Sequence, residues 1–111
     1  MKVIYNKFIP FKGFSAINLL GVVFARKEYE PVSEQTLNHE AIHTAQMKEL
    51  LFVGFYLWYV LEWLIKLCFY GKRAYYEISF EREAYDKMRY FGYLSFRKKY
   101  SFLKYIRNEK N

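Results

Sequence analysis

The segment Asn38-His39-Glu40-Ala41-Ile42-His43-Thr44-Ala45-Gln46 reads H-E-x-x-H and holds both histidines of the 111-residue chain. On a helix, residues four apart lie on one face, so His39 and His43 can bind one metal ion. Glu40 lies about 100° round the helix, within reach of a metal-bound water. Zinc held by two imidazoles and a carboxylate keeps one position for water, which Glu40 would deprotonate. The alternative is two surface histidines without a metal, because so short a motif also occurs by chance.

The composition predicts one globular domain, residues 1–111, with an aromatic-rich core. Hydrophobic residues make up 53% and aromatic residues 23% of the chain, which excludes the composition of a disordered protein. The single cysteine, Cys68, excludes an internal disulfide. It is typical of a reducing compartment, so we expect a cytoplasmic protein.

The net charge of +7 is concentrated near the C-terminus, where residues 97–110 carry six basic side chains and one acidic one. A basic tail can attract nucleic acid or anionic lipid. No nucleic-acid-binding motif accompanies it, so we interpret the tail as the solvated face of a helix and do not expect nucleic-acid binding.

The N-terminal third is expected to form a short antiparallel sheet. Residues 16–26 are apolar without a 3.6-residue period, which predicts a strand kinked at Gly21. A signal peptide would also combine basic residues with an apolar run. Pro10, Gly13 and Asn18 interrupt that pattern, so we do not expect a signal peptide.

Ser33 is a predicted N-cap, and the helix that carries the H-E-x-x-H motif is expected over residues 34–50. Gln46 lies on the histidine face and is a candidate hydrogen-bond partner near the site, although we favour the interpretation that it only completes the polar surface of the helix. Later helices are expected over residues 80–91, capped by Ser79, and over residues 95–107, with basic residues opposite an apolar seam.

Residues 50–70 are almost entirely apolar, with Glu62 and Lys66 spaced to form an ion pair. We expect a fully buried helix of the aromatic core. An interfacial helix, with Trp58 and Trp63 at the level of lipid headgroups, is an alternative, and a membrane-spanning helix is a third. Association with a membrane surface through this stretch is therefore a candidate property.

A catalytic zinc site needs a third protein ligand, which here must be a carboxylate. The candidates are Glu49, Glu62, Glu77, Glu81, Glu83, Asp86 and Glu109. The segment from Ser79 to Asp86 stands out among them, because it opens a second helix whose first turn can face the first.

The sequence H-E-A-I-H-T-A-Q followed by F-E-R-E-A-Y-D resembles the gluzincin clan of zinc metallopeptidases, especially its minimal single-domain members. The resemblance implies that Glu81 is the third ligand and that Ala84 lets the two helices approach. Glu83 is the alternative ligand. The clan usually has an aspartate four residues after the ligand to orient a histidine, but this chain has Tyr85 there and Asp86 next to it. Either the Tyr85 hydroxyl takes that role, or Asp86 reaches in, or the site is weakened.

Together these features predict an α+β fold, mostly helical, in which the two motif helices pack with the sheet. The predicted function is hydrolysis of a peptide or protein substrate by zinc, with Glu40 as general base. By analogy with the clan, the strand would align the substrate. The alternative is a non-catalytic, zinc-stabilised interaction or membrane-surface module. Candidates for an oxyanion donor are Tyr75, Tyr76, Tyr85, Tyr90 and Tyr93.

Overall fold

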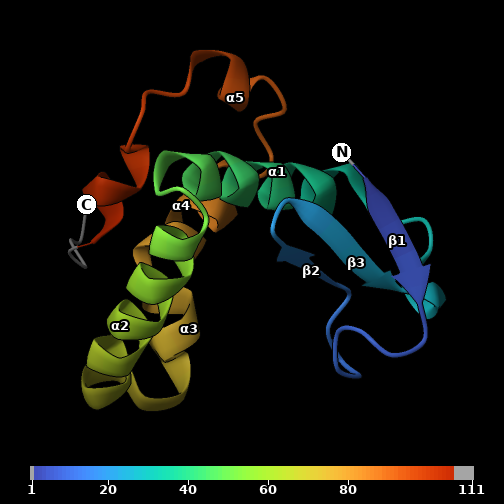
Figure 1. Cartoon of the computed structure of the whole chain (residues 1–111), viewed down its shortest axis with the longest axis horizontal. Helices are drawn as coiled ribbons and strands as arrows, with labels where there is room; N and C mark the ends of the chain where they lie inside the picture. The colour runs from blue at the N-terminus through green and yellow to red at the C-terminus, as the bar shows by residue number, and fades with distance from the viewer. Residues whose placement is uncertain (1, 107–111) are drawn as a thin grey trace.

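The computed structural model describes residues 2–106 and has an α+β fold that is mostly helical, as predicted (Figure 1). A small sheet comes first, and the helices follow it. The strands are β1 (Val3–Asn6), β2 (Ala16–Leu19) and β3 (Val22–Arg26). The helices are α1 (Glu34–Glu49), α2 (Val53–Tyr70), α3 (Ala74–Glu77), α4 (Ser79–Lys87) and α5 (Tyr93–Phe96). Short 3₁₀ turns are formed by Lys27–Tyr29, Gly71–Arg73 and Ser101–Tyr105.

The sheet has the order β1-β3-β2 and is mixed, not wholly antiparallel as expected. β1 runs parallel to β3, whereas β2 and β3 are antiparallel. The single kinked strand predicted over residues 16–26 is instead a hairpin. Leu20 and Gly21 form its turn with φ angles of 54° and 89°, so the chain reverses where we expected a bend.

The predicted α1 is confirmed, and Ser33 is its N-cap, because the Ser33 side chain accepts a hydrogen bond from the Thr36 N–H. The helix ends at Glu49, and Leu51 and Phe52 both adopt positive φ before α2 begins. This break turns α2 away from the axis of α1 (Figure 1).

The core is rich in aromatic rings and lies where α1, α2 and α4 meet. Phe80 is its centre, with ring centroids 4.5 Å from Phe55 and 4.6 Å from Phe102. A second buried cluster joins α1 to α4 through Ile42 and Ala84. Ala84 is completely buried, so a larger side chain there would push the two helices apart.

The expectation that residues 50–70 form a fully buried helix is wrong. Of the residues in α2, only Phe55, Glu62 and Lys66 are buried. The two charged side chains therefore face inward, and most of the apolar ones face outward. A long apolar helix in the core of a protein is mostly buried. The most apolar stretch within residues Val53–Lys87, in contrast, is only 17% buried.

Two further expectations on the C-terminal helices are corrected. Ser79 does not cap α4 with its side chain, because its hydroxyl donates to Glu62. The helix predicted over residues 95–107 is divided into α5 and the turn Ser101–Tyr105, and Arg97 between them is extended. The extended backbone carries the Arg97 guanidinium to two buried carboxylates, which outweighs local helix propensity. The basic residues expected beyond residue 106 lie outside the described part.

Candidate metal centre

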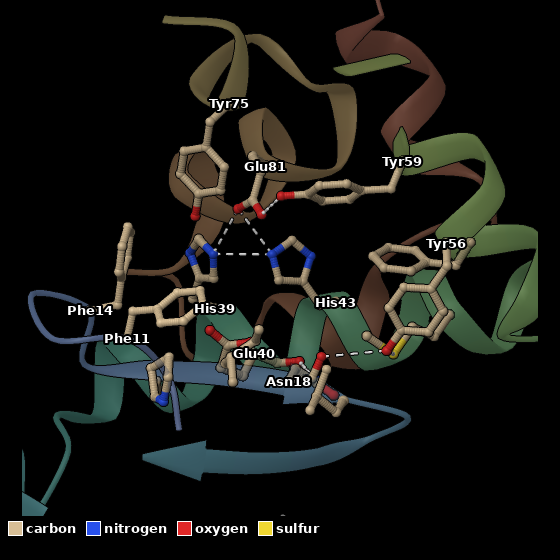
Figure 2. Close-up of a pocket in the computed structure, with 16 residues that line it drawn as sticks. Phe11, Phe14, Asn18, His39, Glu40, His43, Tyr56, Tyr59, Tyr75 and Glu81 are labelled. Carbon is tan, nitrogen blue, oxygen red and sulfur yellow. Dashed lines mark hydrogen bonds and ion pairs between the residues drawn. The ribbon is translucent and has the colours of Figure 1, made fainter. Parts of the chain in front are cut away.

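The two histidines of the H-E-x-x-H motif lie side by side on successive turns of α1. Both side chains are buried, and their Nε2 atoms are 3.1 Å apart. The rings meet edge to face, with centroids 4.7 Å apart, so both nitrogens point at the same place (Figure 2). The spacing of the motif thus produces the shared face that the sequence predicted.

Glu81 of α4 completes a triangle with the two histidines. Its Oε1 atom is 3.1 Å from Nε2 of His39 and 3.1 Å from Nε2 of His43. Its other oxygen, Oε2, accepts a 2.7 Å hydrogen bond from the Tyr59 hydroxyl of α2. Tyr59 thereby fixes the carboxylate so that Oε1 faces the imidazoles.

The three donor atoms form a group that could hold a metal ion. Ligand bonds of about 2.0–2.1 Å at tetrahedral angles place donor atoms roughly 3.3 Å apart, close to the 3.1 Å found here. Two imidazole nitrogens and one carboxylate oxygen suit a first-row transition metal. The residues present therefore fit a metal ion in both spacing and chemistry.

The charges of the cluster favour a cation at its centre. Burial opposes ionisation of Glu81, but the two imidazoles outweigh it and hold the pKa of its carboxyl far below the usual range. Burial likewise opposes the charged form of His43, yet the Glu81 carboxylate prevails and raises the pKa of His43 to about 9. For His39, burial prevails and lowers the pKa. A metal ion would take the place of the His43 proton beside the carboxylate.

A chain of buried polar groups orients His43 from behind. Its Nδ1 atom is 2.8 Å from Oε1 of Gln46, and Gln46 Nε2 donates to Phe80 O and to Glu83 Oε1. Because the amide nitrogen of Gln46 faces two acceptors, its oxygen must accept from His43, which places the proton on Nδ1. Nε2 of neutral His43 is then free to bind a metal. The interpretation of Gln46 as part of the polar surface of the helix is wrong, because Gln46 is fully buried and is a hydrogen-bond partner of His43.

Glu83 does not reach the triangle of donor atoms, although the sequence left it as the alternative ligand. It is fully buried behind Gln46, where Arg97 bonds both of its carboxylate oxygens and Tyr93 donates to one of them. Arg97 also pairs with Glu49 across 2.6 Å. Glu83 is thus an anchor for the residues that hold His43.

Neither the Tyr85 hydroxyl nor the Asp86 carboxylate orients a histidine. The Tyr85 ring packs edge-on against His39, with centroids 4.4 Å apart, and its hydroxyl meets that of Tyr75 at 3.1 Å. Asp86 accepts a hydrogen bond from Tyr105 on the outer side of α4. Tyr85 therefore confines His39 by packing, and Asp86 lies away from the cluster.

A cavity of about 340 Å³ opens over the three donor atoms. Its walls are β2, α1, the first turns of α2, Tyr75, and the loop that carries Phe11 and Phe14 (Figure 2). Glu40 lines the same cavity, and burial raises the pKa of its carboxyl to about 7. A carboxyl group with this pKa can exchange protons near neutral pH.

Asn18 and Tyr59 are site residues that the sequence reasoning missed. Asn18 of β2 donates to the Glu40 carbonyl and to Thr44 Oγ1, both at 2.8 Å, and so fastens the strand to α1 beside the cavity. The signal for it was a lone amide in an apolar strand. Tyr59 had no such signal, since it is one of 12 tyrosines.

Comparisons with protein-family models, with curated proteins and with solved structures found no match for this chain. The assignment of a function therefore depends on the geometry of the site.

Proposed function

We propose that this chain is a zinc-dependent peptide hydrolase of the gluzincin type. His39, His43 and Glu81 would hold the ion, and Glu40 would act as general base. The observation that carries the proposal is the triangle of three donor atoms, each 3.1 Å from the others, under a cavity that Glu40 also lines. A purely structural metal site has no use for an additional carboxyl group poised near neutral pH.

When bound, zinc would acidify a water molecule and polarise the carbonyl group of the substrate. Glu40 would accept the proton of the attacking water while the water oxygen forms a bond to the carbonyl carbon. The same carboxyl group would then donate that proton to the amine as the carbon–nitrogen bond breaks. The pKa of Glu40, about 7, suits both transfers.

The edge of β2 offers a place for an extended peptide. Arg26 N donates to Ser15 O, so these two residues form a hydrogen-bonded pair of the antiparallel ladder. Because such pairs alternate, the N–H and C=O groups of Ala16 and Asn18 point away from β3, toward the open edge. The Asn18 carbonyl accepts from Tyr56 at 3.5 Å, and Ala16 lines the cavity. A peptide strand added there would lie across the metal centre.

Tyr75 is the best-placed of the candidate oxyanion donors, because it lines the cavity (Figure 2). Its hydroxyl group is held by Tyr85 at 3.1 Å and lies on the same side of the cavity as Glu81. A neutral hydroxyl in this position can donate a hydrogen bond to the developing oxyanion.

The test is Glu40→Gln, with Glu34→Gln on the exposed first turn of α1 as the matched control. We expect both variants to bind one zinc per chain by elemental analysis. Hydrolysis of a quenched fluorescent peptide library should fall at least a hundredfold in Glu40→Gln alone, because only that residue moves the proton. Loss of zinc from Glu40→Gln would contradict the base role. A zinc-loaded wild-type protein without hydrolysis would favour a non-catalytic, zinc-stabilised module.

A further inference from the structure

The helix α2 has its polarity reversed relative to a helix of a water-soluble core. Ten of its residues are exposed, and every one of them is uncharged and apolar. They are Val53, Leu57, Val60, Leu61, Trp63, Leu64, Ile65, Leu67, Cys68 and Phe69. Both charged residues of the helix are buried. A helix at a water-facing surface shows the opposite pattern, with charged residues outside and apolar residues inside.

The two buried charges fix this orientation of α2. Glu62 accepts hydrogen bonds from the backbone and the hydroxyl group of Ser79 and from the Trp58 indole. Lys66 lies 3.4 Å from Glu62 and donates to the carbonyl groups of Glu77 and Ile106. Rotating the helix to hide its apolar face would take both charges away from the Ser79 N–H and from the carbonyl groups of Glu77 and Ile106, which would then lack their partners.

The apolar surface is too wide for a single helix or strand of a partner to cover. At 100° per residue, the exposed positions occupy roughly 240° of the circumference of α2. A packed helix covers a stripe of about 100°. A hydrocarbon phase, in contrast, surrounds whatever part of a helix enters it. The width of the surface therefore favours lipid over a second copy of this chain or another protein.

The C-terminal end of α2 and the loop between β1 and β2 carry side chains that suit a bilayer containing anionic lipid. Lys72 and Arg73 follow directly after the helix and are exposed. On the same side of α1, the loop between β1 and β2 exposes Phe8, Phe11 and Phe14, which are 83%, 84% and 60% exposed (Figure 1). Basic residues beside exposed aromatic and aliphatic side chains are typical of proteins that bind at a membrane surface.

We propose that the apolar face of α2 inserts into one leaflet of a phospholipid bilayer, with the loop that carries Phe8, Phe11 and Phe14 as a second contact. The helix is about 27 Å long, which approaches the thickness of the hydrocarbon layer. It does not cross alone, however, because α3 and α4 return beside it and carry charged residues such as Glu77. Insertion from one side keeps that hairpin and its inner charges intact.

The experiment uses the full chain with extruded vesicles of phosphatidylcholine and 30% phosphatidylglycerol. We expect the protein to sediment with the vesicles and brominated lipids to quench Trp63, which lies on the apolar face. Trp58 packs inside against Phe80 and Phe102. The quenching should therefore persist in Trp58→Phe and be lost in Trp63→Phe.

A triple variant, Leu57→Gln with Leu61→Gln and Leu64→Gln, should lower partitioning into vesicles at least tenfold. The matched control replaces three exposed apolar residues elsewhere, Phe91, Leu94 and Phe96, by glutamine and should bind like the wild type. Circular dichroism and zinc content check that both variants fold. The quenching of Trp63 in the wild type does not depend on either variant.

Three results would overturn the proposal. The first is a wild-type protein that stays in the supernatant. The second is a lipid-free dimer in which Trp63 is protected from acrylamide, because a second copy would then cover the face. The third is vesicle binding that 0.5 M salt abolishes and that the triple variant leaves unchanged, because charge alone would then explain it.

Discussion

Replacing Gln46 by methionine tests whether its buried amide supports the candidate metal centre. Gln46 is fully buried, accepts from His43 Nδ1 and donates to Phe80 O and Glu83 Oε1. Methionine has a similar size but makes none of these hydrogen bonds. Loss of the partner that orients a metal-binding histidine typically lowers metal affinity 10- to 100-fold, which is about 1.4–2.7 kcal/mol.

The same substitution should destabilise the metal-free protein. A buried polar group left without its partner costs about 1–3 kcal/mol. The Phe80 carbonyl and His43 Nδ1 both lose a partner, whereas Glu83 keeps Arg97 and Tyr93. We therefore expect the free energy of unfolding to fall by about 3 kcal/mol.

Zinc affinity would be measured by competition with a chromophoric chelator, and stability by urea unfolding in the presence of a chelator. Gln35→Met, in the first part of the same helix, is the matched control and should change neither quantity. Gln46→Glu keeps an acceptor for His43 but faces Glu83 and the Phe80 carbonyl without a donor. It should keep zinc affinity and lose stability. Wild-type zinc affinity in Gln46→Met would refute the orienting role.

Two other measurements test the buried charges. Lys66→Met should lower the free energy of unfolding by about 3 kcal/mol, because it leaves the Glu62 carboxylate and two carbonyl groups without their cation, whereas Lys72→Met on the surface should change it by less than about 0.5 kcal/mol. Equal effects of the two substitutions in urea unfolding would mean that the pair is not buried. Zinc affinity should rise with pH between pH 6.5 and about 9, by up to about tenfold per pH unit, because zinc must displace the proton that the raised pKa of His43 retains. The same raised pKa stabilises the metal-free protein below pH 6.5, and this contribution is lost as the pH rises through 9. Chelator competition at several pH values measures the zinc affinity, and urea unfolding measures the stability of the metal-free protein. A zinc affinity that does not change with pH would contradict the presence of a proton on His43.

The parts of the fold that the sequence predicted are those with strong local signals. Ser33 marks the start of α1, and the spacing of the histidines sets the face that they share. The hairpin of β2 and β3 was missed because its turn is Leu20-Gly21, and leucine rarely adopts the positive φ that it has here. The Leu20 N–H bonds to the Tyr56 hydroxyl, a contact with α2 that no local pattern reveals.

In the candidate site, too, the sequence predicted the residues that belong to local motifs and missed those that come from distant segments. The spacing within the motif placed His39 and His43, and the position of Glu81 followed only from a second motif 38 residues after His43. The groups behind these residues come from distant parts of the chain, such as Tyr59 on α2 and Arg97 after α5. Long-range contacts of this kind leave no periodicity in the sequence. Asp86, a possible replacement for the aspartate of the clan, lies outside the cluster and accepts a hydrogen bond from Tyr105.

The reversed polarity of α2 connects the proposed membrane contact to the candidate metal centre. The i, i+4 spacing of Glu62 and Lys66 predicted their pairing but not the direction in which the pair faces. Inside the protein, Glu62 holds the backbone of Ser79, two residues before Glu81. One turn before Glu62 on α2, Tyr59 holds the carboxylate of Glu81 itself. The inner face of α2 thus positions Glu81, one of the three residues that could hold a metal ion, while the outer face of the helix remains apolar. The buried charges therefore support the candidate site and leave the apolar face exposed for the proposed contact with lipid.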